Sequence, residues 1–428
     1  MAVTHRSLSV AVESSFGSLS ASTGLPDNSG LTFVSIPCER DPILVAGEPV
    51  FSERNDARDG NYSIPSEPDT VWSGGSRVRR RTGQITVRVD LTTLGTSADT
   101  YAANYLGYLL GAGLKTQLPS ITSDSVTAVD GNTYTPTSAP AEADVGTLVS
   151  STINGRAEYS AITDNADGSS NVTISPAFSG SSYTSVRNMQ TWYIPGRTAT
   201  GTREHSLAFR VDGVDFRSFA YGCVLESLSI TLDNGRLMAD LVYQSALIQD
   251  DHSSAVGPIE PTYNSGAAQL FRGAYVVASS TSPTSLTNAT TGDKLARTAL
   301  QAEDFSLTLT NTLTPLGHSN DILAMSDMDI SDTTVELSLT LSSPASLVAD
   351  DFFNRTVRQI VVGTGPQGDG LGCALMLPAA MLTVDPSAYD VSGNDIVRQQ
   401  LTYSQSRFGG DVVESNAANS PFRLGLGI

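Results

Sequence analysis

Thr82–Gly113 of the chain reads TGQITVRVDLTTLGTSADTYAANYLGYLLGAG, and Thr333–Gly365 reads TTVELSLTLSSPASLVADDFFNRTVRQIVVGTG. Both stretches begin with strictly alternating apolar and polar residues, continue through polar turn formers and end in a helical pattern closed by glycine. Strict alternation is typical of a half-buried β-strand, and apolar residues three and four apart are typical of an amphipathic helix. The sequence therefore predicts that a strand–turn–helix unit occurs twice.

The two predicted strands have clean apolar faces, because every second side chain of a strand points to the same side of the sheet. In the first copy this face holds Ile85, Val87, Val89 and Leu91, and in the second it holds Val335, Leu337, Leu339 and Leu341. The second helix is expected to continue through Ile360 and Val361 and to end at Gly363, with Arg355 and Arg358 as surface charges on its exposed side.

Each copy is followed by two further predicted strands. The first pair lies in YGCVLESLSITLDNGRLMADLVYQS (Tyr221–Ser245), and the second in CALMLPAAMLTVDPSAYDVSGNDIVRQQLTYSQS (Cys373–Ser406). Residue by residue, 230–233 aligns with 382–385, and 241–244 aligns with 401–404. The order of elements predicts a duplicated β-rich building block.

Composition supports a mainly β protein. Hydrophobic residues make up 39% of the 428 residues and charged residues only 16%, which does not suit a helical bundle or a disordered chain. The net charge of −19 disfavours a protein that grips nucleic acid, because such a protein needs a basic surface. Two interpretations of this charge stay open: solubility through self-repulsion, or a wall from which DNA is repelled.

The three cysteines, Cys38, Cys223 and Cys373, are far apart and form neither a disulfide framework nor a CxxC metal motif. The N-terminal segment lacks the apolar core of a signal peptide, and no apolar run is long enough for a transmembrane helix. We therefore expect buried thiols, folding in a cytoplasm and no membrane segment.

Turn-forming residues and linkers divide the chain into six segments. Asp130-Gly131, Asn154-Gly155 and Asp167-Gly168 are hairpin-type turns and indicate a small inserted β-domain. The expected order is a first unit at 1–115, the inserted β-domain at 116–200, the return of the first unit at 201–250, a linker at 251–265, a second unit at 266–414 and an extended C-terminal arm at 415–428.

Residues 51–81 are polar and rich in turn formers, which predicts a loop of about thirty residues; such loops usually serve binding or assembly. Its end carries a basic cluster, Arg77, Arg79, Arg80 and Arg81. Phosphate contact is one interpretation of this cluster. The net charge of the chain favours another, contact with the acidic surface of a second copy.

Sequence motifs for catalysis or cofactor binding are missing. None of the four histidines lies in HExxH or beside a cysteine cluster, and neither a GxSxG elbow nor a P-loop is present. A glycosidase carboxylate pair stays open as a weaker alternative, although two tryptophans make an aromatic sugar cleft unexpected. We expect a chain that is not an enzyme and that binds no metal or cofactor.

A long polar loop, an alternating strand, a helix and a closing pair of strands resemble the tail tube protein of long-tailed bacteriophages. TGQITVRVDL with YLGYLLGAG, the 222–245 stretch, DFSLTLTNTL and DISDTTVELSLTL carry this resemblance. It implies two tandem β-sandwich units, each with one flanking helix and each contributing strands to an inner barrel. It also implies self-assembly into stacked rings that conduct DNA. With two units per chain, the expected ring is a trimer with pseudo-sixfold symmetry.

The resemblance also implies partners and site residues. Tail terminator, distal tail and tape-measure proteins are the expected partners in a virion with a non-contractile tail, assembled in the host cytoplasm, and DNA is expected to pass without specific binding. Acids of the paired strands are candidates for the tube lumen: Asp90, Glu226, Asp240, Glu336, Asp385 and Asp395. Candidates for an inter-ring loop are Arg54, Asp56, Arg58, Asp59, Trp72, Arg77, Arg79, Arg80 and Arg81.

Two other interpretations stay open beside the tube protein. A distal tail or baseplate protein of the same fold would form one ring that does not polymerise. A β-rich adhesin or carbohydrate-binding protein would form no ring, although the missing signal peptide disfavours it.

Overall fold

The computed structural model describes the strands, the helices and most of the short connections of the chain. The described residues are 6–18, 27–37, 43–52, 77–92, 105–121, 123–138, 144–164, 171–195, 201–213, 216–250, 275–279, 297–317, 325–342, 348–364, 372–386, 389–392, 396–405 and 417–427. The prediction of a mainly β protein is confirmed, since only two α-helices, α1 (Tyr105–Gly111) and α2 (Val348–Asn354), occur within these residues.

One group of six strands closes into a small barrel in the order β10-β7-β6-β11-β8-β9. Its core is apolar and includes Val149, Ile162 and Ile174. The turn between β8 and β9 is Asn154-Gly155, with φ of 51° and 77°, as the Asn-Gly pattern predicts. The barrel strands are β6 (Ser123–Asp130), β7 (Thr133–Pro136), β8 (Leu148–Ile153), β9 (Arg156–Asp164), β10 (Val172–Ser175) and β11 (Ser185–Asn188), all inside the 116–200 segment.

The other strands form one continuous network of 19 strands. Those up to residue 250 are β1 (Ser7–Val12), β2 (Val34–Ile36), β3 (Ile43–Ser52), β4 (Arg77–Asp90), β5 (Lys115–Gln117), β12 (Gln190–Tyr193), β13 (Leu207–Asp212), β14 (Arg217–Asp233), β15 (Arg236–Ser245) and β16 (Leu247–Asp250). The later ones are β17 (Tyr275–Ser279), β18 (Arg297–Ala299), β19 (Ala302–Leu316), β20 (Asp327–Leu341), β21 (Arg358–Gly363), β22 (Cys373–Leu382), β23 (Tyr389–Ser392), β24 (Ile396–Gln405) and β25 (Arg423–Leu426).

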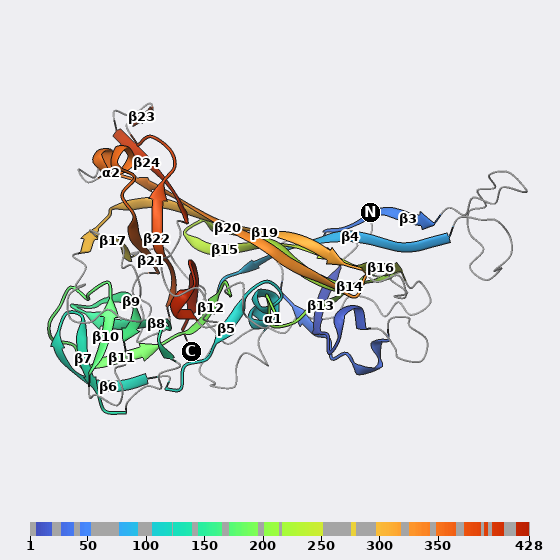
Figure 1. The fold of residues 1–428 in the computed structure, drawn as a ribbon, viewed down its shortest axis with the longest axis horizontal. Coiled ribbons are helices and arrows are strands. Elements are labelled where there is room, and N and C mark those ends of the chain that lie inside the picture. The colour runs from blue at the N-terminus through green and yellow to red at the C-terminus, as the bar shows by residue number, and fades with distance from the viewer. Residues whose placement is uncertain are drawn as a thin grey trace, which may run out of the picture.

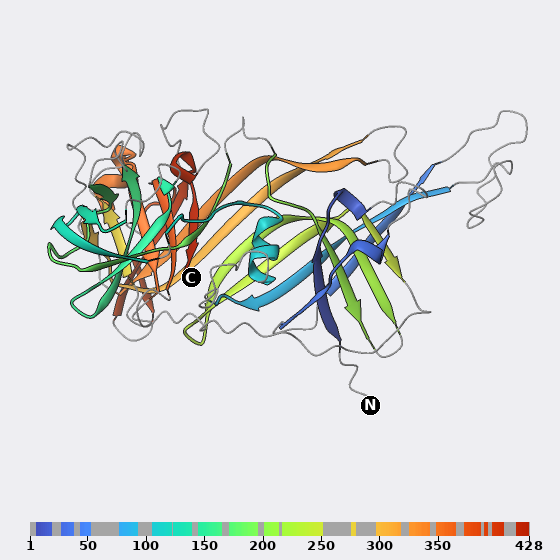
Figure 2. The same ribbon diagram turned by 90° about the horizontal axis from the view of Figure 1, so that it is seen from below.

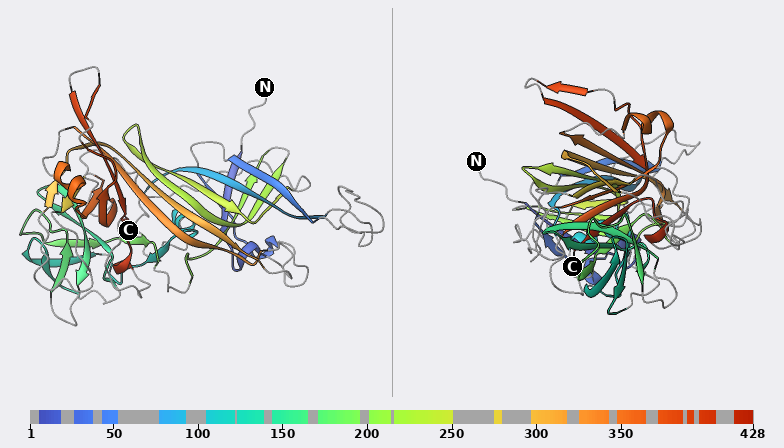
Figure 3. Two further views of the ribbon diagram at one scale, coloured as in Figure 1. Left: turned by 45° about the horizontal axis from the view of Figure 1, so that its top comes forward. Right: turned by 90° about the vertical axis from the view of Figure 1, so that its left-hand side faces the viewer.

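The long strands make an antiparallel sheet in the order β3-β4-β15-β14-β19-β20-β24. They cross most of the molecule, and the barrel lies at the end where β21 and β22 are found (Figure 1). The chain returns from β15 to β19 so that β14 and β19 lie side by side, yellow-green beside orange in Figure 3. Helix α1, cyan in Figure 2, lies against these long strands and is buried with them in the main core.

Strand pairing in the first 250 residues recurs in residues 275–426. Seven pairings have a counterpart: β1–β2 with β17–β18, β1–β13 with β17–β21, β13–β14 with β21–β22, β14–β15 with β22–β24, β14–β16 with β22–β25, β4–β15 with β20–β24, and β3–β4 with β19–β20. Even a bulge recurs, between Leu207 and Phe209 in β13 and between Arg358 and Ile360 in β21.

The prediction for the end of the second helix is wrong. Helix α2 ends at Asn354, and Arg358, Ile360 and Val361 belong to strand β21. Arg358 is buried and forms a bidentate ion pair with the buried Asp351, at 2.8 Å from Nε to Oδ2 and 2.6 Å from Nη2 to Oδ1. Tertiary pairing with β17 and β22 overrides the apolar spacing that suggested a longer helix.

The C-terminal segment is part of the fold. Strand β25 lies between β12 and β22, with Leu424 opposite both Trp192 and Leu375. Phe422, Leu424 and Leu426 are fully buried. The segment predicted as an extended arm is extended at 423–426, but it is covered by the chain's own strands.

Candidate assembly interface

The long sheet presents one polar face. A single row of directly paired residues crosses six strands and consists of Arg88, Asp240, Ser229, Thr308, Glu336 and Ser404. Directly paired residues of an antiparallel sheet point to the same side. The opposite face is apolar and belongs to the main core, where Val87, Leu228 and Leu337 are buried. This polar face is the first candidate surface for assembly.

Hydroxyl groups dominate the neighbouring rows of this face. Short hydroxyl side chains make it polar with little charge, so that it is less acidic than the net charge of −19 suggests. The rows on either side are Thr86, Val242, Ser227, Thr310 and Thr334, and Asp90, Met238, Thr231, Ser306, Ser338 and Thr402.

Most of the candidate lumen acids in the first half of the sheet have partners. Asp240 lies 3.6 Å from Arg88, which also pairs with Asp233 at 2.7 Å. Asp90 pairs with Arg236 at 3.2 Å.

The remaining candidate acids lie in three different places: on the sheet, at its edge, and outside the described residues. Glu226, the extra residue of a bulge in β14, accepts a hydrogen bond of 2.7 Å from Gln84. Glu336 is exposed on β20, and Asp385 is exposed just beyond the end of β22. Asp395 lies outside the described residues.

The predicted 51–81 loop is shorter than expected. Phe51 and Ser52 end strand β3, and the arginines at 77, 79, 80 and 81 belong to strand β4. Cross-strand pairing with β3 overrides the polar composition of these residues. The other candidates for inter-ring contact, Arg54, Asp56, Arg58, Asp59 and Trp72, lie outside the described residues.

A second candidate surface is the junction between β14 and β19 inside the chain. Five residue pairs, from Ser227 with Thr310 to Thr231 with Ser306, join the two strands. Beside them a separate apolar cluster packs the end of the β19–β20 hairpin against β14. This cluster holds Val224, Ala246, Met325, Met328 and Ile330, with Phe16 and Leu313 at its margin.

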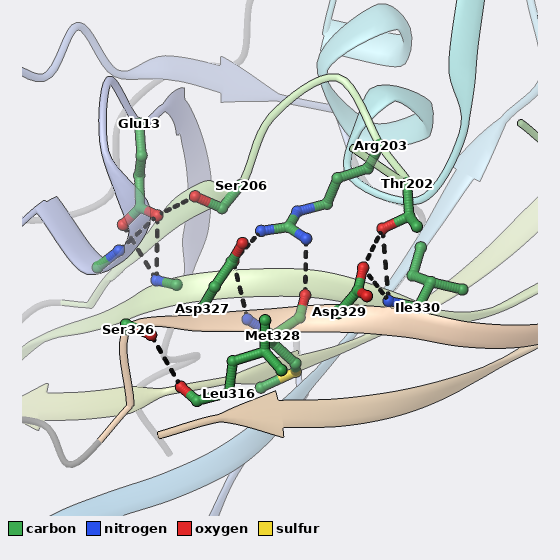
Figure 4. A network of polar contacts seen from close by, with 12 residues as sticks. Glu13, Thr202, Arg203, Ser206, Leu316, Ser326, Asp327, Met328, Asp329 and Ile330 are labelled. Atoms are coloured by element: carbon green, nitrogen blue, oxygen red, sulfur yellow. Dashed lines mark hydrogen bonds and ion pairs between the residues drawn. The ribbon is translucent and has the colours of Figure 1, made fainter. Parts of the chain in front are cut away.

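A polar network fixes the same hairpin to the segment before β13 (Figure 4). Arg203 forms an ion pair with Asp327 and donates a hydrogen bond of 2.6 Å to the Met328 carbonyl. Thr202 donates to Asp329 at 2.7 Å. The acidic start of β20 is therefore bound by Arg203, which lies in the segment before β13.

Glu13 lies at the other side of this network as a buried carboxylate (Figure 4). It accepts hydrogen bonds from the Ser206 hydroxyl at 2.6 Å, the Gly222 amide at 3.0 Å and the Gly17 amide at 3.1 Å. Burial raises the pKa of Glu13 above its ordinary value of 4.5, and these donors oppose the rise. Gly222 has φ +60°, and an added Cβ would lie 2.8 Å from Ala246, so this close approach requires glycine.

The pKa of Glu13 predicts a pH-dependent contribution to stability. Because the folded pKa is raised, the contribution of Glu13 is fully present below the unfolded value near 4.5 and is lost as the pH rises through the folded pKa. Relative to a Glu13→Gln variant, the wild type should therefore be less stable at pH 8 than at pH 5, by about 1.4 kcal/mol for each unit by which the folded pKa of Glu13 exceeds 5. Urea unfolding at both pH values measures this difference. The surface variant Glu303→Gln is the control, and an equal wild-type–variant difference at the two pH values would contradict the assignment.

The described residues show no candidate metal centre. No group of three or more His, Cys, Asp or Glu residues that could hold a metal ion occurs among them. Cys223 and Cys373 are buried free thiols, and burial raises the pKa of both. None of the described helices is both long enough and apolar enough to cross a membrane.

Sequence reasoning missed the β14–β19 junction and its network, because Thr202, Arg203 and Glu13 are isolated in sequence from their partners. No protein-family model matches the chain, and no curated protein matches it either.

Proposed function

We propose that this chain is a structural tail tube protein of a long-tailed bacteriophage, in which three copies close into a ring and the rings stack into a hollow conduit for DNA. The observation that supports it most strongly is the junction inside the chain. There β14, at the edge of the first half's part of the sheet, pairs with β19, at the edge of the second half's part. A ring needs the same contact between chains.

The recurring pairings support two tandem units. They also revise the alignment of the closing strands. Leu225 is opposite Tyr243, and Leu382 is opposite Tyr403, while the matching β4 and β20 pairings equate Tyr243 with Tyr403. The counterpart of Leu382 is thus Leu225, five residues before the position that the sequence alignment gives. A bulge at Glu226 in one copy and the 385–388 segment in the other hide this register from a sequence comparison.

Two strand edges support closure into a ring. Among the described strands, β3 pairs only with β4, and β23 pairs only with β24. Open strand edges favour pairing with another chain, and closing a barrel removes them. In a ring, the β22–β23 edge of one copy pairs with β3 of the next, as β14 pairs with β19 within a chain.

The polar face is suited to the inner wall of such a tube. In the three paired rows named above, Arg88 is the one cation and it is paired with Asp233, so these rows offer no cluster of cations to phosphates and DNA would pass them without specific binding. Asp90, Glu226, Asp240 and Glu336 would lie on this wall. The chain then acts by assembly and not by catalysis, with tail terminator, distal tail and tape-measure proteins as its partners in the virion.

The loop between β3 and β4 remains the proposed inter-ring contact. Deleting residues 55–73 should leave soluble protein that forms rings but no longer stacks them, because both flanking strands are retained. Sedimentation and negative-stain images of the variant measure this. Tubes of normal length from the variant would show that the loop is not needed for contact between rings.

Negative-stain microscopy of the purified wild-type protein tests the function itself. Long hollow tubes of stacked rings are the expected result. Isolated discs would favour the distal tail or baseplate alternative. A stable monomer without rings at high protein concentration would contradict both and favour the adhesin alternative.

A further inference from the structure

The β19–β20 hairpin and the β3–β4 hairpin are counterparts with opposite charge. Both have a bulge at the same place, where the pairing skips Ser331 of β20 and Arg79 of β4; the β3–β4 pairing also skips Thr82, and β20 has no such second irregularity. The residues around the bulge correspond in order, so that Val78 matches Ile330. On this register Arg77 takes the place of Asp329, and Arg80 takes the place of Asp332.

The segments before β13 and β21 lie at equivalent places in the chain, although the first is irregular and the second contains the end of helix α2. Thr202 and Phe353 both lie five residues before the first paired residue of the strand that follows, which is Leu207 in β13 and Arg358 in β21. Thr202 donates a hydrogen bond to Asp329 at the start of β20, in the β19–β20 hairpin. Phe353, in contrast, is 74% exposed. Single exposed hydrophobic residues are ordinary on a protein surface, so Phe353 gains weight only from its place on α2, which packs against β22.

The neighbouring strand edge shows the same contrast. Leu228 in β14 is 0% exposed because it pairs with Leu309 of β19. On the register that equates Val242 with Thr402, its counterpart is Val384, which is 53% exposed. Thr383, the residue before it, keeps the matching hydrogen bond to the Thr402 carbonyl. Among the described residues, no strand pairs with this edge as β19 pairs with β14.

We propose that the β3–β4 hairpin of a second copy docks across Phe353 and the Val384 edge, and that this junction between chains has the reverse charge polarity of the junction within the chain. The inference rests on the proposed function and specifies its contact. Residues 77–81 carry four arginines and no acid, whereas the described residues 381–386 and 389–392 carry two aspartates, Asp385 and Asp390, and no basic residue. A basic hairpin thus meets an acidic edge.

Reversed polarity fixes the order of units around the ring. The β19–β20 hairpin carries Asp327, Asp329 and Asp332, so placing it beside Asp385 and Asp390 of another copy would oppose like charges. Opposed like charges disfavour the wrong partner. First and second units would therefore alternate around the ring. Contacts between two first units or between two second units would be disfavoured.

The first test is Phe353→Ser, with Val129→Ser as its matched control. Val129 is 56% exposed on strand β6 of the small barrel, away from both junctions. Both variants should keep the circular dichroism spectrum and melting temperature of the wild type. Phe353→Ser should lower the association constant for rings at least about tenfold, and Val129→Ser should assemble as the wild type does, both measured by sedimentation velocity.

The second test addresses polarity and register. Arg77→Asp with Arg80→Asp should abolish rings, and adding Asp385→Arg with Asp390→Arg should restore them. The register of β14–β19 pairs Val384 with Ala46 of the next copy, so Val384→Cys with Ala46→Cys should give covalent trimers on mild oxidation. Such a bridge needs the two Cα atoms within about 7 Å.

The outcomes separate this inference from the proposed function. Rings from the wild type together with normal rings from Phe353→Ser, or no interchain disulfide in the cysteine variant, would overturn the docking mode and leave the ring intact. Absence of rings from the wild type would overturn the proposed function itself.

Discussion

Replacing Arg358 with methionine should lower the free energy of unfolding by about 3–5 kcal/mol. The substitution keeps much of the side-chain volume but leaves the Asp351 carboxylate buried without its bidentate partner. It also removes the hydrogen bond of 3.2 Å from Arg358 to the Ser279 carbonyl. Because Asp351 lies on α2, the variant should also loosen the helix that presents Phe353.

Arg398→Met is the matched control for this prediction. Arg398 pairs with Glu303 at 2.6 Å, as short a contact as the buried pair makes, but both side chains are more than a third exposed. An exposed pair of this kind contributes about 0–1 kcal/mol. Urea and thermal unfolding of the two variants should therefore differ clearly. Equal and small losses would show that the buried pair does not hold α2.

Deleting residues 423–428 should prevent the chain from reaching its folded, soluble state. The deletion removes Leu424 and Leu426, both fully buried, and a single buried leucine truncated to alanine already costs about 2–5 kcal/mol. It also removes Arg423, which donates to the Ala417 and Ala418 carbonyls at 2.6 and 2.8 Å, and it leaves β12 and β22 with open edges.

Leu424→Ala is the graded form of this experiment, because it keeps the backbone pairing of β25. We expect a soluble protein with a loss of about 2–5 kcal/mol in urea unfolding. Leu118→Ala, at a leucine that is half exposed, should change little. A soluble deletion variant with the melting temperature of the wild type would contradict the role given to β25.

Local pattern predicted the parts of the fold that depend on neighbours in sequence. The alternation at 85–91 and 335–341 became buried faces of β4 and β20, and the Asn154-Gly155 pair became a turn with both φ values positive. These features are set within a few residues, where strand periodicity and turn geometry act directly.

Long-range pairing decided the parts that local pattern missed. Apolar spacing places Arg358 on a helix, yet pairing with Ala380 of β22 makes it the first residue of strand β21, where Asp351 neutralises its charge. Residues 77–81 read as a loop, yet β3 pairs with them. No local pattern in the sequence indicates that β25 pairs with both β12 and β22 and lies between them.

The sequence predicts which types of residue form the candidate surfaces better than it predicts which of them contact each other. Acids such as Asp90 and Asp240 were selected by alternation, but the arginines that pair with them could be assigned only from register. The junction of β14 with β19 depends on residues about eighty positions apart, such as Leu228 and Leu309. Neither residue differs in type from other core leucines, so no local signal distinguishes them.

The number of chains per ring tests the account most directly. Native mass spectrometry of assembled rings, combined with cryo-electron microscopy class averages, measures both subunit count and symmetry. The account predicts closed rings of three 44.9 kDa chains with threefold symmetry and six similar lobes. Rings of six chains, or a chain that stays monomeric at concentrations where tubes should form, would contradict it.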